Sequence, residues 1–485
     1  MISDILLEIF GEFMKQPFGN SLTIKGKPGA GKTTFALELL DWLKEKAPVY
    51  YVGTRSSNDP LREKFPWISD VSSGSKVRRR NKDALNEVVK ENLNKLERMI
   101  EEGKVSKSYA FGGEPGLVLN IEEILPELES MYNFVGENID KGPIVVLDSI
   151  EALAEKYDLD PSLLFSIIQK DLAEKSGANL ILIQESDQPS PLDYYSDGVV
   201  QMNYSMDNNF LIRDVTILKL RGVSIGSSPT YLYSLENGRF HSFRRDMITY
   251  PNQRVRNVRK ADERQFEVSL GSQELSKVLP TLSDKVPLGS VVMFHRETKS
   301  NMVDSYVNAL KNSLIKYNVS NGRGVIDISS SSYESSKIFV NTMDPEWLKN
   351  YITAERTDKT SPFVINIGGR TMIEDFPKEV LDYYLTHSKK PYTYVFSTDF
   401  LRFTYGESFF GDLSTIINGV RPTGIIVIIA DDEEYKKIYH YASFTVHVHD
   451  INGYVMINSN AVNHFVTSVG LDDEKWPELK FSIIV

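Results

Sequence analysis

The chain has 485 residues, of which 41% are hydrophobic and 25% are charged. This composition is usual for a globular protein, and the length exceeds what one hydrophobic core supports, so we expect at least two domains. The formal net charge of −11 argues against a protein that is basic as a whole, as many nucleic-acid-binding proteins are. The absence of cysteine excludes disulfides and thiolate chemistry, and it fits a reducing cytoplasm or a thermophile that avoids labile residues.

The pattern of the first ten residues predicts an amphipathic helix. They also lack the basic segment with which a signal peptide begins, so a signal peptide is not indicated. No apolar run in the chain reaches the ~18 residues that suggest a membrane span. We therefore expect a cytoplasmic protein that does not bind a membrane.

A phosphate-binding loop follows the next predicted element, a short buried strand at residues 21–24, and precedes a helix predicted at 33–44. The motif G-x-x-x-x-G-K-[ST] consists of Gly26, Lys27, Pro28, Gly29, Ala30, Gly31, Lys32 and Thr33. Glycines let backbone N–H groups approach phosphates, and the helix N-terminus adds the positive end of its dipole. We expect this loop, together with Thr34, to bind ATP, with Lys32 reaching the β- and γ-phosphates.

Short apolar strands alternate with helices through the rest of the first half. Strands are predicted at residues 49–52, 144–148 and 180–185, and a charged surface helix at 76–103. This alternation indicates a parallel sheet covered on both faces, in which ligands bind at the carboxyl ends of the strands. Because Asp148, Gln184 and Glu185 end their strands, we expect them to converge with the loop on one nucleotide.

Asp148 and the Thr33 hydroxyl are the expected ligands of Mg²⁺, an ion that prefers oxygen ligands. The alternative for Asp148 is a helix N-cap, because a helical pattern follows it. Gln184 is expected to sense the γ-phosphate or to position water, and the alternative is a buried polar residue. Glu185 and Glu151 are further candidates for activating the attacking water.

Two short stretches in this half resemble the RecA-like superfamily, and within it the KaiC-type ATPases. They are Asp197-Gly198-Val199-Val200 and Lys219-Leu220-Arg221-Gly222, which is similar to that family's K-x-R-G hairpin. The resemblance implies that Lys219 and Arg221 reach the nucleotide of a neighbouring subunit, where a cation offsets the charge of the transferring phosphoryl group. The alternative is that both are solvated residues on one face of a strand.

Residues 1–245 further resemble a KaiC-like subgroup, the archaeal gas-vesicle regulators of the GvpD type. The segments that carry the resemblance are Tyr51-Val52-Gly53-Thr54-Arg55-Ser56, Phe65-Pro66-Trp67 with Leu61 before it, and Phe35-Ala36-Leu37-Glu38-Leu39-Leu40. The resemblance implies a regulatory protein, a homo-oligomer such as a hexamer, and a protein partner.

The chain departs from the KaiC and RecA pattern after the second strand. Those ATPases usually carry an acidic residue there to activate water, but Thr54-Arg55-Ser56 occupies the place and the next carboxylate is Asp59. Because a general base must lie within hydrogen-bonding distance of the water, we expect slow hydrolysis. Arg55 is a candidate for contacting a phosphate or the adjacent subunit.

Two basic clusters stand out in an acidic chain. They contain Lys76, Arg78, Arg79, Arg80 and Lys82, and Arg244, Arg245, Arg254, Arg256, Arg259 and Lys260. Charge runs usually indicate solvated surface, and the alternative is a docking site for an acidic partner or for nucleic-acid phosphates. The second cluster lies at the start of an interdomain linker that we predict at residues 246–280.

Residues 281–485 read as a degenerate copy of the first domain, with an unrelated α/β domain as the alternative. Residues 289–294 parallel the strand before the phosphate loop, but residues 295–300 replace the loop without G-K-T. Further strands are predicted at residues 325–328, 363–367, 392–396, 425–429 and 444–449, and Asp399 lies near the place of Asp148. His447, His449 and the nearby His440 suggest a metal site, but no Cys or matched carboxylate spacing supports it, so packed imidazoles are favoured.

Together these features predict an α/β protein with a RecA-like P-loop domain at 1–245, the linker at 246–280 and a degenerate RecA-like domain at 281–485. The expected function is that of a nucleotide-dependent regulatory switch that binds ATP with Mg²⁺ and hydrolyses it slowly. Two alternatives remain, a DNA-dependent ATPase of the RecA type and an autokinase of the KaiC type. The net negative charge makes nucleic acid the less favoured partner.

Overall fold

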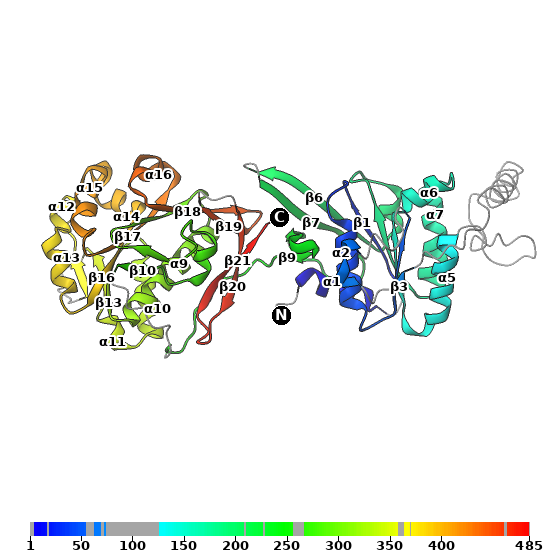
Figure 1. The fold of residues 1–485 in the computed structure, drawn as a ribbon, viewed down its shortest axis with the longest axis horizontal. Coiled ribbons are helices and arrows are strands. Elements are labelled where there is room, and N and C mark those ends of the chain that lie inside the picture. The colour runs from blue at the N-terminus through cyan, green and yellow to red at the C-terminus, as the bar shows by residue number, and fades with distance from the viewer. Residues whose placement is uncertain are drawn as a thin grey trace, which may run out of the picture. The chain divides into compact units, whose positions relative to one another are not determined.

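The structure is a computed structural model that divides into two compact units, residues 1–243 and 244–484 (Figure 1). The residues that it describes are 4–16, 19–54, 63–68, 72–73, 126–207, 210–226, 228–255, 266–356, 363–368, 370–459 and 463–484. The expected long helix at 76–103 lies outside these residues.

The first unit is built on a sheet with the strand order β3-β2-β4-β5-β1-β6-β7-β8-β9. Its strands are β1 Ser21–Gly26, β2 Val49–Gly53, β3 Ser72–Ser73, β4 Ile144–Asp148, β5 Asn179–Gln184, β6 Gly198–Asp207, β7 Phe210–Leu220, β8 Thr230–Ser234 and β9 His241–Ser242. Strands β3 to β6 pair in parallel, and β6 to β9 continue as antiparallel hairpins. The mostly parallel sheet predicted for this half is confirmed.

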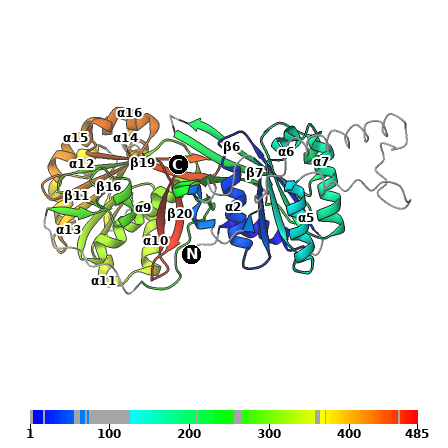
Figure 2. The same ribbon diagram turned by 45° about the vertical axis from the view of Figure 1, so that its right-hand side comes forward.

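Helices cover both faces of this sheet, because its strands are apolar on both sides. The helices are α1 Ile5–Met14, α2 Lys32–Leu43, α5 Pro126–Asn138, α6 Ile150–Lys156, α7 Pro161–Ile168 and α8 Pro191–Tyr195. Leu22 and Ile24 of β1 pack in one buried cluster with α1 and α2, whereas Val145 and Leu147 of β4 pack in another with α5, α6 and α7. Figure 2 shows α2 on one side of the strands and α5, α6 and α7 on the other.

The second unit repeats this architecture on a larger sheet with the order β15-β14-β13-β16-β17-β12-β18-β19-β20-β21. Its strands are β12 Val291–Arg296, β13 Arg323–Ile328, β14 Tyr351–Glu355, β15 Val364–Asn366, β16 Lys389–Ser397, β17 Gly424–Asp431, β18 Phe444–Ile451, β19 Tyr454–Ser459, β20 Phe465–Leu471 and β21 Pro477–Ile483, with β10 Glu267–Ser269 and β11 Lys285–Pro287 in a separate pair. Its helices are α9 Asn301–Ser320, α10 Ser332–Thr342, α11 Pro345–Leu348, α12 Met372–Asp375, α13 Lys378–Leu385, α14 Thr398–Tyr405, α15 Phe409–Val420 and α16 Asp432–Ile438.

The two sheets share one topology. In each, the first strand of the parallel core lies between the last parallel strand and the strand that opens the antiparallel hairpins: β1 between β5 and β6, and β12 between β17 and β18. Both of these first strands have six residues and lead into a helix, α2 or α9. The second unit is thus an α/β domain with the topology of the first, as expected for a second α/β domain, with β15 added at one edge.

The segment predicted as a linker belongs largely to the second unit. Val255, Val268, Leu270 and Leu275 are buried in the same core as α9, because the segment 266–280 packs against that helix. The unit boundary after Phe243 lies close to the predicted end of the first domain at residue 245.

Candidate nucleotide-binding site

The phosphate-binding loop connects β1 to α2 at the carboxyl edge of the first sheet. Gly26 ends β1, and a Cβ there would lie 2.2 Å from the carbonyl oxygen of Met202 on β6. Gly31 has a φ of 87°, and a Cβ there would lie 2.7 Å from Leu235. Both positions therefore require glycine, which keeps the loop backbone accessible to a ligand.

The loop backbone is held in shape by its own contacts. The Ala30 N–H donates to the Lys27 carbonyl at 3.2 Å, and the Tyr233 hydroxyl donates to the Ala30 carbonyl. Helix α2 begins after Gly31 without a capping side chain. The first N–H groups of a helix have no partner within the helix, so they can donate hydrogen bonds to phosphate oxygens. Lys27 and Pro28 are exposed, and Thr34 is buried in the first turn of α2.

Lys32 lies across the loop, because its ammonium donates to the Gly26 carbonyl at 2.7 Å and to the Lys27 carbonyl at 3.0 Å. Its side chain is largely buried, with 6% of the residue exposed. The charge is thus positioned directly over the backbone that would receive the phosphates.

Thr33 and Asp148 meet at the same edge. The Thr33 hydroxyl donates to Asp148 Oδ2 at 2.7 Å, and the Tyr51 hydroxyl donates to the same oxygen at 2.7 Å. The alternative interpretation of Asp148 as a helix cap is wrong, because Ser149 is the N-cap of α6 and accepts from the Ala152 N–H at 3.4 Å. A hydroxyl and a carboxylate in contact are the oxygen ligands that Mg²⁺ takes beside a nucleotide.

Tyr51 was not predicted as a site residue. It lies two residues before Gly53, which pairs with Asp148 across β2 and β4, so the strand pairing brings its hydroxyl to the carboxylate. Burial, and then the charge of Asp148, raise the pKa of Tyr51 far above its usual value, so its hydroxyl stays protonated and donates.

Thr54 directly follows β2, at the place where the KaiC and RecA pattern predicts an acid. The Thr54 hydroxyl donates to the carbonyl of Asp148 at 3.0 Å, and its N–H donates to the same carbonyl at 2.7 Å. Thr54 therefore fixes the backbone that follows β4. Arg55 and Ser56 lie outside the described residues.

Glu151 is a carboxylate close enough to Lys32 to be affected by its charge. It lies in the first turn of α6, and its Oε1 accepts from the Glu185 N–H at 3.2 Å. Burial raises the pKa of Glu151, although the nearby charge of Lys32 opposes that shift. Gln184 is 4% exposed, and its side-chain oxygen accepts from the Ser190 hydroxyl at 3.3 Å, so it lies at the predicted strand end in a buried polar contact.

Lys219 and Arg221 lie together at the amino ends of the parallel strands, opposite the ends that carry the phosphate loop. Leu220 pairs with Gly198 at the start of β6, where β1 also begins, whereas the phosphate loop follows the end of β1. The Lys219 ammonium donates to the carbonyls of Asp193, Tyr194 and Ser196, and Arg221 pairs with Asp197 at 2.9 Å. The Arg221 side chain is 58% exposed and is thus accessible to another molecule.

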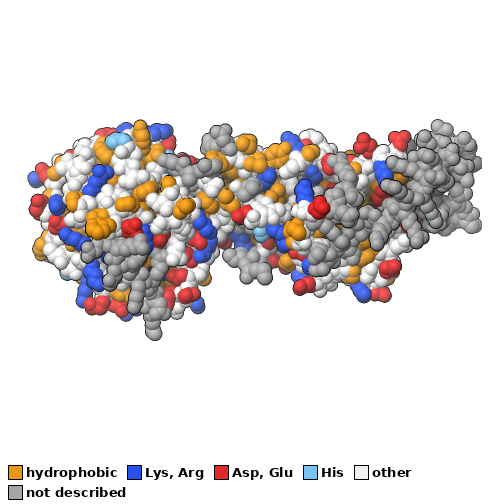
Figure 3. Space-filling view, in the orientation of Figure 1, with side chains coloured by type: hydrophobic (Ala, Val, Ile, Leu, Met, Phe, Trp, Pro, Cys, Tyr) orange, Lys and Arg blue, Asp and Glu red, His pale blue; other side chains and the backbone are white. Residues whose placement is uncertain are grey.

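The basic clusters are described only in part. The first cluster, at residues 76–82, and residues 256–260 of the second lie outside the described residues. Arg245 donates to the Asn452 carbonyl at 3.1 Å and lies over the ring of Tyr454. On the face drawn in Figure 3, acidic and basic side chains are interspersed over the described surface.

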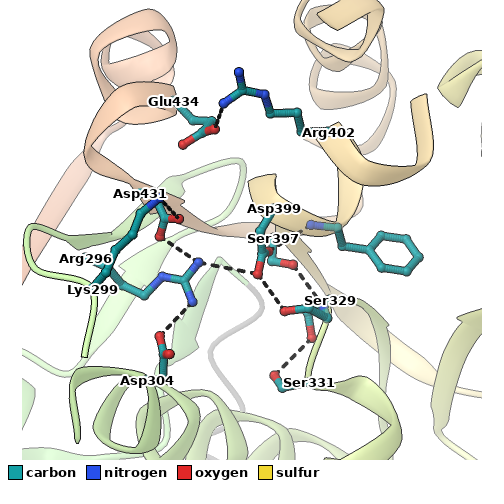
Figure 4. A network of polar contacts seen from close by, with 12 residues as sticks. Arg296, Lys299, Asp304, Ser329, Ser331, Ser397, Asp399, Arg402, Asp431 and Glu434 are labelled. Carbon is teal, nitrogen blue, oxygen red and sulfur yellow. Dashed lines mark hydrogen bonds and ion pairs between the residues drawn. The ribbon is translucent and has the colours of Figure 1, made fainter. Parts of the chain in front are cut away.

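The corresponding edge of the second unit is filled by charges of the chain itself (Figure 4). Arg296 ends β12 as Gly26 ends β1, and its guanidinium lies 2.7 Å from Asp431, 2.9 Å from Asp304 and 3.5 Å from Asp399. Asp399 follows β16, so it lies at the edge predicted for it.

The helix that follows is also closed to phosphates. Ser300 caps α9 and accepts from the Val303 N–H at 3.1 Å, whereas α2 begins without a capping side chain. Replacement of the glycine loop therefore removes both the open backbone and the available helix N-terminus, as expected for a domain without G-K-T.

No helix in the described part of the chain combines the length and the apolar character needed to cross a membrane.

Comparison with known proteins gives two matches to one family. A model of the GvpD gas vesicle protein P-loop domain matches residues 10–218, and a model of GvpD basic region 2 matches residues 273–485. Proteins GvpD1 and GvpD2 of Halobacterium salinarum are each 27% identical to the chain over 237 and 238 residues, respectively. These alignments cover 47% and 48% of the chain and 39% and 43% of the two relatives, so the chain spans about two fifths of their length.

Among solved structures, a KaiC-like protein from the hyperthermophilic archaeon Pyrococcus horikoshii OT3 matches with 20% identity and a TM-score of 0.31. The match covers 47% of this chain and 91% of that protein.

Proposed function

We propose that the first unit binds ATP with Mg²⁺, hydrolyses it slowly and acts as a nucleotide-dependent regulatory switch, because its residues 10–218 match the P-loop domain of the GvpD proteins. The observation that carries this proposal is the 2.7 Å contact between Thr33 and Asp148 beside the glycine loop. One ion between these two side chains and the phosphates would join the loop to β4.

Each residue of the loop has a defined part in this proposal. The backbone from Gly26 to Gly31 receives the phosphates, Lys32 exchanges its two carbonyl contacts for phosphate oxygens, and Thr33 and Asp148 hold Mg²⁺. Tyr51 orients the Asp148 carboxylate by its hydrogen bond.

Slow hydrolysis follows from the groups that are available to activate water. Thr54 has no basic side chain, and its hydroxyl is bound to the backbone of β4. Glu151 is the candidate base, but its Oε1 already accepts from the Glu185 N–H at 3.2 Å, and this contact limits the freedom of the carboxylate to reach a water. Turnover then depends chiefly on positioning and charge stabilisation.

The regulatory part of the proposal rests on Lys219 and Arg221. They lie at the edge of the sheet away from the loop of their own chain, so they are suited to completing the site of a neighbouring subunit in a homo-oligomer. Nucleotide state would then alter the subunit interface, and with it the surface offered to a protein partner.

The test measures Mg²⁺–ATP binding to the full chain by calorimetry, with Lys32→Ala and the matched control Lys44→Ala at the end of α2, where Lys44 pairs with Asp41 on the surface. Loss of the buried cation should weaken binding by about 30-fold or more, because hydrogen bonds to charged groups contribute roughly 1.5–3 kcal/mol each. Lys44→Ala should bind as the wild type does. Equal affinity of wild type and Lys32→Ala would refute the proposal.

A further inference from the structure

A cluster of three histidines and one glutamate lies at the ends of β12 and β18 in the second unit. The two strands pair in parallel with His295 opposite His447. Side chains alternate along a strand, so His295 and Glu297 share one face while Arg296 points to the other, and His447 and His449 share a face in the same way. The cluster is therefore separate from the charge network around Arg296.

Three atoms of this cluster face one another. The Nδ1 atoms of His295 and His447 are 3.0 Å apart, and Glu297 Oε1 lies 2.9 Å from the latter and 3.9 Å from the former. In a tetrahedral site with zinc–ligand bonds of about 2.0 Å, the ligand atoms lie about 3.3 Å apart, which is close to the separations of these three atoms.

The surroundings hold the His295 ring in place. His295 is 3% exposed and stacks on Tyr435, with ring centroids 3.8 Å apart.

Two further groups orient the ligands. Asp432 Oδ1 lies 3.4 Å from His295 Nε2, the ring nitrogen that faces away from the cluster. His449 Nδ1 lies 3.4 Å from Glu297 Oε2, the carboxylate oxygen that is not shared with His447. A carboxylate behind a ligating histidine is the usual outer partner in zinc sites, because it fixes the ring orientation.

We propose that His295, Glu297 and His447 bind one divalent transition-metal ion of the Zn²⁺ class, with Asp432 and His449 as positioning residues. Two imidazole nitrogens and one carboxylate oxygen suit such an ion better than Mg²⁺ or Ca²⁺, which prefer oxygen ligands alone. The half-exposed Glu297 leaves a fourth position open to solvent. The site lies in the second unit and does not depend on nucleotide binding by the first.

The test uses the full chain, stripped of metal with a chelator and titrated with Co²⁺ in the absence of nucleotide, and it follows the visible absorption of tetrahedral Co²⁺. The chain has no cysteine, so a thiolate cannot contribute to the spectrum. We expect one ion per chain, displaced by Zn²⁺. Glu297→Gln and His447→Gln should each weaken binding by at least about 100-fold, since loss of an outer partner alone costs 10–100-fold.

His440→Gln is the matched control, because His440 is exposed in the turn before β18 and should leave Co²⁺ binding unchanged. Glu297→Gln preserves shape at a half-exposed position, so it decides the question if His447→Gln does not fold. Absence of the Co²⁺ band, or equal binding by wild type and Glu297→Gln, would show that the histidines are packed imidazoles and would overturn the proposal.

Discussion

Replacement of Arg296 by methionine tests whether the charge network of the second unit is held by one buried cation. The side chain of Arg296 is 12% exposed, and it is surrounded by Asp431, Asp304 and Asp399 at 2.7, 2.9 and 3.5 Å. Arg296→Met fills most of the same volume but removes the charge, so three carboxylates remain close together without their shared partner.

The expected loss of stability is about 3 kcal/mol. Breaking a buried ion pair typically costs 3–5 kcal/mol, and the low end applies because Asp304 and Asp399 are partly exposed to water. For a unit of this size, such a loss lowers the midpoint of thermal unfolding by about 6–12 °C.

The pH dependence of the stability loss in Arg296→Met gives a second, independent test. Burial raises the pKa of Asp431, while the charge of Arg296 opposes that shift. Without Arg296 the folded-state pKa rises further above the unfolded value, so the protonated carboxyl is favoured in the folded state. The variant's deficit should therefore be largest at neutral pH and should shrink as the pH falls toward about 4.

Differential scanning calorimetry of the full chain resolves the effect, because Mg²⁺–ATP should raise only the transition of the unit that binds it. The matched control is Lys349→Met in the same unit, whose ammonium is 53% exposed and pairs at 2.6 Å with Glu346, which is 74% exposed. Water screens that pair, so its removal should change the transition little. If Arg296→Met shifts the second unit no more than Lys349→Met, or if its deficit does not shrink in acid, the reasoning is wrong.

Two further predictions concern the first unit. Glu151→Gln should lower the slow ATPase rate by about 100-fold or more while leaving ATP affinity unchanged, since a general base contributes 10²–10⁴-fold. Steady-state phosphate release measures the rate and calorimetry measures the affinity, and an unchanged rate would exclude Glu151 as the base. Arg221→Ala should bind ATP normally but lose nucleotide-dependent assembly, which light scattering after size exclusion measures. Assembly equal to that of wild type would remove the basis for a contact in trans.

The sequence predicts those parts of the site that depend on local order. The loop from Gly26 to Thr33 is continuous, and Asp148 and Gln184 end apolar strands, so parallel pairing alone places them at one edge. The fold class follows from the same alternation of strands and helices.

The parts that the sequence did not predict come from distant pairings. Tyr233 and Leu235 line the loop from about 200 residues away along the chain, and no local pattern marks them. Glu297 precedes His447 by 150 residues, so the carboxylate that the histidine pattern lacked is found only when β12 pairs with β18. That Ser149 and not Asp148 caps α6, and that Asp148 meets Thr33, is likewise seen only in the structure.

The two units differ at one position of their shared topology, where the first strand of the parallel core ends and the next helix begins. In the first, the strand ends in glycine and the next helix begins without a capping side chain, so an anion gains backbone donors that the chain does not use itself. In the second, Arg296 and Ser300 supply a cation and a cap from the chain, and a phosphate would have to compete with three carboxylates already bound. The second edge is thus complete without nucleotide, and the metal site proposed at His295, Glu297 and His447 lies on the other face of the same strands.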